Sequence, residues 1–239
     1  VSSLYSQGDK SSAKLVQIQD ENDKTQQRSE KMDEQSRINE AANFLDLLFA
    51  PVTTPKFSYL WIKKGETKKT IPFDVSNPQN RLEMAKQAIS YNDNGYDVYL
   101  GVCLMDKAPM ANNRAKSNDI TLQTAIWTDI DIESTAHKSS EKEKLAPDFN
   151  IARKFLPFEA SITVNSGYGL HGYNLLDTPL EINDNNRNAA KDRNKKYIDI
   201  IRKNAGEYKI DGVADLARVL RVPGTYNFKL GSEEHTSEL

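Results

Sequence analysis

The segment SITVNSGYGLHGYNLL, residues 161–176, contains two apolar runs separated by a short glycine-rich turn. Each run has the length and the β-branched or aromatic content of a strand. The turn is too short for the helical crossover that joins parallel neighbours, so the two strands should be antiparallel. This spacing favours an α+β fold with a largely antiparallel or mixed sheet over a doubly wound parallel sheet.

The rest of the chain supplies further strands and four helices. Strands are expected at residues 56–64, 70–75, 96–105 and 122–133. Helices are expected at residues 38–49, 77–95, 149–156 and 183–206. Strands and helices mix along the chain without an internal repeat.

The composition fits a folded domain with polar ends. Of 239 residues, 38% are hydrophobic and 28% are charged, which is enough apolar material for a sizeable core. Residues 1–37 are polar and nearly free of aromatic residues, so we expect a disordered or solvated arm. Residues 38–229 should form the domain. The last nine residues resemble translated sequencing-adapter sequence, so we interpret 230–239 as a non-native or truncated tail; an ordinary polar tail is the alternative.

Cysteine content and charge limit the expected cellular location and the kinds of partner. The single cysteine, Cys103, excludes a disulfide framework and zinc ligation by paired thiolates, and it favours a reducing, cytoplasmic location. No run approaches the roughly 18 apolar residues of a membrane helix, so no membrane partner is expected. The formal net charge of −2 argues against a general polyanion binder. However, residues 187–229 carry eleven Lys or Arg against five Asp or Glu, which indicates either a nucleic-acid surface or a solvated helix face.

Paired carboxylates occur in WTDIDIE, residues 127–133. Alternate residues of a strand share a face, so Asp129 and Asp131 should point the same way with their Cα atoms about 6.5–7 Å apart. Half-burying two adjacent carboxylates is costly unless a cation compensates, and Mg²⁺ and Mn²⁺ favour such oxygen ligands. The alternative is an edge strand with a solvent-facing acidic side.

The turn of the opening segment offers groups that could hold an anion. Gly167 and Gly169 allow positive φ and close backbone approach, and backbone N–H groups in such turns can bind anions. Ser166 adds a hydroxyl, and His171 lies on the following strand. A plain hairpin turn with a hydrogen-bonded core histidine is the alternative.

Cations cluster in VADLARVLRVPGTYNFK, residues 213–229. A short helix beginning at Asp215 would place Arg218 one turn further on and Arg221 three residues later. The Pro-Gly pair should end this helix and return the chain as a strand that carries Lys229. Arginine is suited to bidentate phosphate contact. The alternative is a helical Asp–Arg pair worth only about 0.3–0.5 kcal/mol.

Together, three carboxylates, a Ser/His glycine turn and a row of cations form a set typical of nucleotidyl transfer. WTDIDIE, SGYGLHGY and DLARVLRVPGTYNFK, in this order, resemble the three motifs of the archaeo-eukaryotic primase superfamily. The resemblance is closest to the primase-polymerase domains of phages, plasmids and integrated elements, and it covers about residues 38–229. RVLRVPGTxNxK is its most specific signature. Arg114, beyond the strand expected at 96–105, resembles the family's arginine before the first motif.

This resemblance implies a two-lobed primase catalytic core with an RRM-like mixed or antiparallel sheet flanked by helices. It implies three acidic ligands for two Mg²⁺ or Mn²⁺ ions: Asp129, Asp131 and Asp215. It also implies a nucleotide-binding set: Ser166, Gly167, His171, Arg218, Arg221 and Lys229. Such an enzyme would be a DNA primase/polymerase that transfers nucleotides from NTP or dNTP to a primer on a single-stranded DNA template. A replicative helicase, fused or in trans, is an expected further partner.

Two other functions stay open. The first is a non-catalytic replication-initiation module on the same fold, which would bind single-stranded DNA without needing a metal. The second is a metal-dependent nuclease, which would leave the Ser/His turn and the arginine row unexplained.

Overall fold

The structure is a computed structural model that describes residues 32–134, 137–212, 214–228, 234–235 and 237–238. The predicted arm at 1–37 therefore lies mostly outside the described residues, as do Lys229 and much of the predicted tail. Within the described part, no helix is both long and apolar enough to span a bilayer.

Helices and strands follow one another irregularly, as the predicted α+β class requires, and this class is confirmed. The helices are α2 (Glu34–Phe49), α3 (Pro78–Asp93), α4 (Phe149–Lys154) and α5 (Arg187–Ala205), with a 3₁₀ turn at Ser117–Asp119. The strands are β1 (Phe57–Lys64), β2 (Thr67–Asp74), β3 (Asp97–Gly101), β4 (Leu104–Met105), β5 (Ile120–Asp131), β6 (Ile162–Asn165), β7 (Gly169–Glu181), β8 (Val219–Arg221), β9 (Tyr226–Asn227), β10 (Glu234–His235) and β11 (Ser237–Glu238).

Nine of these strands form one sheet in the order β11-β6-β7-β5-β4-β1-β3-β8, with β2 also paired to β1. Every neighbouring strand pair is antiparallel. The sheet has two halves, β2-β1-β3-β8 and β5-β7-β6-β11, which the short strand β4 joins at Phe57↔Met105 and Leu104↔Leu122. The β6–β7 hairpin pairs Val164 with His171, as the opening segment predicts.

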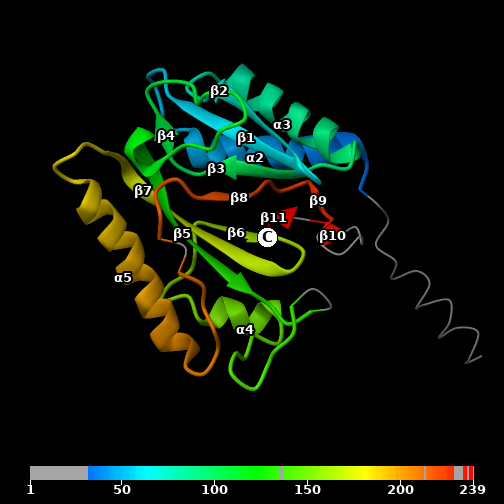
Figure 1. Cartoon of the computed structure of the whole chain (residues 1–239), viewed down its shortest axis with the longest axis vertical. Coiled ribbons are helices and arrows are strands. Elements are labelled where there is room, and N and C mark those ends of the chain that lie inside the picture. The colour runs from blue at the N-terminus through cyan, green and yellow to red at the C-terminus, as the bar shows by residue number, and fades with distance from the viewer. Residues whose placement is uncertain (1–31, 135–136, 213, 229–233, 236, 239) are drawn as a thin grey trace, which may run out of the picture. The chain divides into compact units, whose positions relative to one another are not determined.

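Helices lie beside both halves of the sheet (Figure 1). α3 packs against α2 and contacts β1, β2 and β3, whereas α4 contacts β7 and α5 contacts β5. α2 also contacts β5 and β11 of the second half. One core therefore runs through both halves: Phe44 of α2 meets the ring of Tyr173 on β7 edge-on, with ring centroids 5.3 Å apart. Trp127, Tyr59 and Tyr173 are the largest side chains that this core buries completely.

α3 begins and ends as the sequence predicts. The Asn77 side chain accepts a hydrogen bond from the Gln79 N–H at 2.9 Å, which satisfies an otherwise unpaired amide of the first turn. Asn94 closes the helix and is followed by Gly95 at a positive φ of 78°. α5 ends in the same manner, at Gly206.

The helix predicted from Asp215 is wrong. Residues 219–221 instead form β8, in which Arg221 pairs with Tyr99 of β3. In a helix of about two turns, most backbone amides and carbonyls belong to the end turns, so they have no partner within the helix and are left to water. Pairing with β3 satisfies these groups in the sheet and buries Leu220.

The strand predicted at residues 96–105 is divided in two. β3 ends at Gly101, whose carbonyl accepts a hydrogen bond from the Ser58 hydroxyl at 2.7 Å. A Cβ at Gly101 would lie 2.5 Å from the Tyr59 ring, so the ring occupies the space of a side chain at this position. Beyond this break the chain continues as β4, which pairs with β5 and so joins the two halves of the sheet.

Candidate functional site

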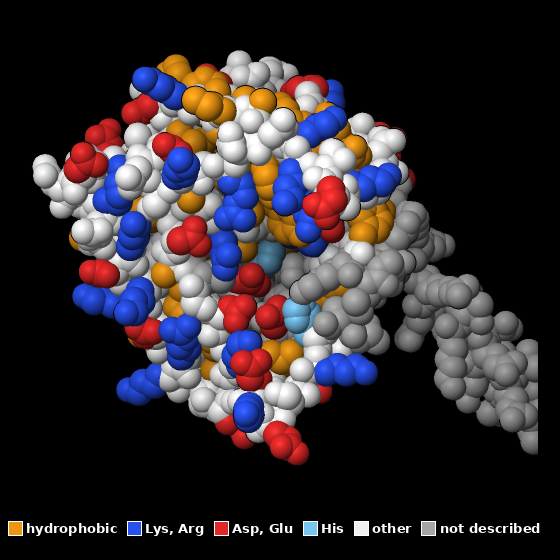
Figure 2. Space-filling view, in the orientation of Figure 1, with side chains coloured by type: hydrophobic (Ala, Val, Ile, Leu, Met, Phe, Trp, Pro, Cys, Tyr) orange, Lys and Arg blue, Asp and Glu red, His pale blue; other side chains and the backbone are white. Residues whose placement is uncertain are grey.

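A cavity of about 450 Å³ opens where the two halves of the sheet meet, and we call it the carboxylate cavity. Figure 2 shows acidic and histidine side chains gathered in a hollow in the middle of this face, with Lys and Arg side chains above it. The β5–β7 half contributes Asp129, Asp131, Ser166, Tyr168 and His171. The other half contributes Lys63, Asp97, Tyr99 and Arg221.

Asp129 and Asp131 both reach this cavity from β5. In the antiparallel register, Asp129 lies opposite His171 and Asp131 lies opposite Gly169. β7 pairs with β5 alongside both aspartates, whereas β4 pairs only with the first residues of β5, Ile120 and Leu122. The two carboxylates are about one-third exposed. Trp127, two residues earlier on the same face, is completely buried, so this face is covered at Trp127 and opens into the cavity at Asp129 and Asp131.

The two aspartates fit a hard divalent cation. Their carboxylates point into one partly solvent-accessible cavity, and oxygen ligands of this type are those that Mg²⁺ and Mn²⁺ prefer. Within the described residues, no group of three Asp, Glu, His or Cys side chains is arranged to hold a metal ion. The donors present therefore suit one ion that keeps several positions for water or substrate, as Mg²⁺ commonly does.

His171 is buried beside Asp129, with its Nε2 3.5 Å from Asp129 Oδ1. Burial, together with the charges of Arg221 and Arg218, lowers the pKa of His171 to about 3, partly opposed by Asp131. The imidazole is therefore neutral at neutral pH. Its Nδ1 is buried and finds no hydrogen-bond partner among the described residues.

The Ser/Gly turn is held by its own hydrogen bonds. The Ser166 N–H and hydroxyl both donate to the Gly169 carbonyl, at 2.8 and 3.1 Å. Gly167 has a φ of 87°, and its N–H donates to Asn165 Oδ1 at 3.0 Å. The amides of Ser166 and Gly167 are thus used inside the turn, and Ser166 is the residue of this turn that lines the cavity.

Arg221 is held rigidly at the other wall. Its Nη1 donates to Asp97 Oδ1 at 2.8 Å, and its Nη2 donates to the Tyr99 hydroxyl at 3.1 Å. Its guanidinium lies 4.7 Å from the centre of the Tyr99 ring. Sequence reasoning missed Asp97, although its alternation with Tyr99 in a β-strand, where aspartate is disfavoured, was an available signal.

Residues 223–227 (PGTYN), within the last motif, are hydrogen-bonded to α2 and α3. Arg37 donates from Nε to the Gly224 carbonyl at 2.7 Å and from Nη2 to Asn92 Oδ1 at 2.9 Å. The Asn92 side chain also pairs with the backbone of Tyr226, at 2.9 and 2.7 Å. These bonds explain the turn after β8, because they hold the end of the motif against α2 and α3.

Other residues of the cavity were not predicted. Asn227 donates from Nδ2 to the Ser166 carbonyl at 2.8 Å, so the last motif and the Ser/Gly turn support one another. His137 Nε2 lies 3.6 Å from Asp131 Oδ1, and its ring meets Tyr168 edge-on. Asn227 belongs to the PGTYN motif, which was a signal that it lies near the site. Nothing in the sequence around His137 indicated that this residue lies there.

The remaining predicted residues do not line the carboxylate cavity. Asp215 is exposed in the loop before β8, where its carbonyl accepts a hydrogen bond from the Arg218 N–H at 3.2 Å. Its charge adds to burial in raising the pKa of the Cys103 thiol, just beyond the end of β3. Arg218 acts on His171 through its charge, and its Nε is buried without a hydrogen-bond partner among the described residues. Lys229 lies outside the described residues.

Comparison with known proteins gives structural similarity alone. No protein-family model matches the sequence, and no curated protein matches it. The AEP domain of the primase-polymerase of cyanophage S-2L superposes with a TM-score of 0.53 at 13% identity, over 84% of this chain and 89% of that one. The catalytic domain of primase RepB′, solved in complex with initiator DNA, gives a TM-score of 0.46 at 11% identity, over 83% of this chain and 84% of that one. The first of these supports what the motifs predict: the chain has the fold of an archaeo-eukaryotic primase (AEP) catalytic domain.

Proposed function

We propose that the protein is a DNA primase/polymerase, which transfers nucleotides from NTP or dNTP to a primer on a single-stranded DNA template. The observation that carries this proposal is the meeting of Asp129, Asp131, His171 and Arg221 in one cavity, although they come from three different strands. Carboxylates, a neutral imidazole and a guanidinium around one hollow suit a polyphosphate bound through a metal ion.

Asp129 and Asp131 would hold a Mg²⁺ or Mn²⁺ ion. Bound there, the ion would acidify a primer 3′-hydroxyl and neutralise charge on the leaving pyrophosphate. Asp215 is the third acid that the resemblance implies for a second ion. Because its loop lies outside the cavity wall, the proposal requires this loop to approach when substrate is bound.

The protein's own side chains would bind the triphosphate. A neutral His171 can donate from Nε2 to a phosphate oxygen, but it cannot serve as a cation at neutral pH. Arg221 supplies positive charge from a fixed position, since Asp97 and Tyr99 hold its guanidinium. The unpaired Nε of Arg218 is a further donor that an anionic ligand could satisfy.

The test is incorporation of labelled nucleotides on unprimed single-stranded DNA with Mg²⁺ or Mn²⁺, read on a gel. Asp129→Asn and Asp131→Asn keep the shape of the side chain and remove its charge, so each should lower incorporation at least about a hundredfold. Asp192→Asn on the exposed face of α5 removes the same charge elsewhere and should leave incorporation unchanged. Products of unaltered length and amount in both cavity variants would exclude the proposal.

The second candidate is a non-catalytic module that binds single-stranded DNA on the same fold. One observation favours it: within the described residues, the acids do not form a three-membered metal site. It predicts DNA binding that falls with salt but does not change when divalent metal is removed. In the same assay, binding without any product would support this candidate, and a shortened template would support a nuclease.

A further inference from the structure

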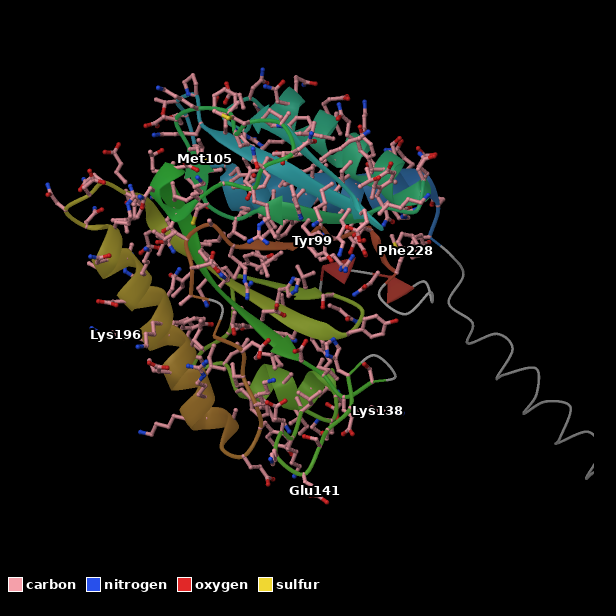
Figure 3. All side chains as sticks on the ribbon, viewed as in Figure 1. Tyr99, Met105, Lys138, Glu141, Lys196 and Phe228 are labelled. Carbon is pink, nitrogen blue, oxygen red and sulfur yellow. The ribbon has the colours of Figure 1, made fainter. Side chains whose placement is uncertain are left out.

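A second cavity, of about 540 Å³, lies under the loop between β4 and β5, and we call it the loop cavity. Its walls run from Met105 to Thr121 and include Arg114. Thr121 and Asp129 lie eight residues apart on β5, which is about 26 Å of extended chain. In Figure 3, Met105 accordingly lies well apart from Tyr99 and Phe228 of the carboxylate cavity. Arg114 therefore does not belong to the first site.

Hydrogen bonds from several elements hold this loop in place. The Thr70 hydroxyl of β2 donates to the Asn113 carbonyl at 2.8 Å. The Tyr59 hydroxyl of β1 accepts from the Ala115 N–H at 3.2 Å. Arg187 of α5 donates to the Ser117 carbonyl at 2.6 Å, and also to the Ile120 carbonyl. β1, β2 and α5 therefore each fix a different point of the second part of the loop, from Asn113 to Ile120, which carries Arg114 and Lys116.

Three cationic residues line the loop cavity: Lys107, Arg114 and Lys116. All three are exposed, and the structure gives none of them an ion pair within the described residues. The two acids of the same lining have other partners. Asp106 pairs with Lys56 at 2.5 Å, and Asp119 accepts from the Lys116 backbone N–H at 2.7 Å. The cavity therefore presents a net positive rim to an incoming ligand.

The walls between these cations are apolar. Ala108, Pro109 and Met110 form one side, and Met110 is 80% exposed, far more than any other large apolar side chain of the described core domain. A small inorganic anion would leave this surface uncovered. A cavity of several hundred Å³ with apolar walls and few charged groups is typical of sites for small organic ligands.

The ligand should therefore combine an anionic group with an apolar part. A docked peptide strand fits less well, because the strands beside the cavity are already paired, Leu104 with Leu122 and Met105 with Ile120. We propose that the loop cavity binds a phosphorylated nucleotide, either free or as one unit of a nucleic-acid strand, with its phosphate on Arg114 and Lys107 and its base against Met110.

Photo-crosslinking of the full chain tests this proposal without relying on catalysis. Two probes distinguish the two sources of the nucleotide: 8-azido-ATP as a free nucleotide, and a ten-residue oligo(dT) that carries one 5-iodouracil. Both are used in the Asp129→Asn/Asp131→Asn background, in EDTA, and the labelled peptides are located by mass spectrometry. We expect label between Lys107 and Lys116 from at least one probe.

The double variant Lys107→Ala/Arg114→Ala should lower this label on the order of tenfold, because two charge-assisted phosphate contacts are lost. Lys195→Ala/Lys196→Ala on the outer face of α5 (Lys196 in Figure 3) removes the same charge and should change it less than twofold. Thermal melting of all variants checks that they remain folded. Label from the oligonucleotide alone identifies a strand as the source. No label in the loop from either probe, or label that survives the double variant, overturns the proposal.

Discussion

His171 Nε2 lies 3.5 Å from Asp129 Oδ1, across the antiparallel pair that β5 and β7 form. The imidazole is neutral because burial and the charges of Arg221 and Arg218 lower its pKa to about 3. It thus places a hydrogen-bond donor beside a proposed metal ligand without adding a positive charge. This combination suits contact with a phosphate oxygen more than proton transfer at neutral pH.

The first prediction concerns the kinetic role of His171. His171→Ala should raise the KM for nucleoside triphosphate about tenfold and change kcat much less, because a ground-state contact to phosphate is lost. His171→Gln retains an N–H donor and should recover part of the affinity. Steady-state incorporation at varied nucleotide concentration measures both constants. An unaltered KM in the alanine variant would remove His171 from the binding site.

The second prediction concerns acid stability in EDTA. The folded protein keeps His171 neutral to about pH 3, whereas the unfolded chain protonates it near pH 6.5. Between these values the unfolded state binds the extra proton, so the free energy of unfolding should fall as pH is lowered. His171→Gln should flatten this slope, by on the order of a few kcal/mol over the window. Urea unfolding at several pH values gives both curves; parallel curves would contradict the prediction.

The third prediction separates the roles of Asp215 and Asp97. Asp215→Asn should abolish incorporation with little loss of stability, because the side chain is exposed and the proposal makes it a metal ligand. Asp97→Asn should instead lower the free energy of unfolding by about 1–3 kcal/mol, because buried Arg221 loses its charged partner. Incorporation and urea unfolding are measured on both. An active Asp215→Asn protein would leave the proposed second ion without its third ligand.

Rules that use only neighbouring residues predicted the elements whose geometry depends on nearby residues. The short spacing of residues 161–176 gave the antiparallel hairpin, and strand alternation placed Asp129 and Asp131 on one face. The sequence also predicted the helix cap at Asn77 and the helix end at Gly206, because each residue satisfies backbone groups only a few residues away.

Contacts over long sequence distances could not be predicted in this way. β8 has only three residues, too few for periodicity to distinguish strand from helix, and its partner β3 precedes it by more than a hundred residues. The Asp97–Arg221 pair spans 124 positions, so no spacing rule connects the two residues. Of the candidate site, the sequence predicted Asp129, Asp131, Ser166, His171 and Arg221 in the cavity, but not the other residues of its wall.

The last prediction concerns the glycine of the PGTYN turn. Gly224 has a φ of 80°, and a Cβ there would clash with the backbone carbonyl of Arg37, which cannot move without disturbing α2. Gly65 is the matched control: its φ is 55°, but nothing lies within 4 Å of its Cβ position. Gly65→Ala should therefore show the conformational cost alone, about 1–2 kcal/mol, whereas Gly224→Ala should add overpacking of about 1–3 kcal/mol. Calorimetry should show a melting temperature for Gly224→Ala that lies several degrees below that of Gly65→Ala, at roughly 2–4 °C per kcal/mol. Equal shifts would mean that the turn is not held against α2 in the way that the Arg37 contacts require.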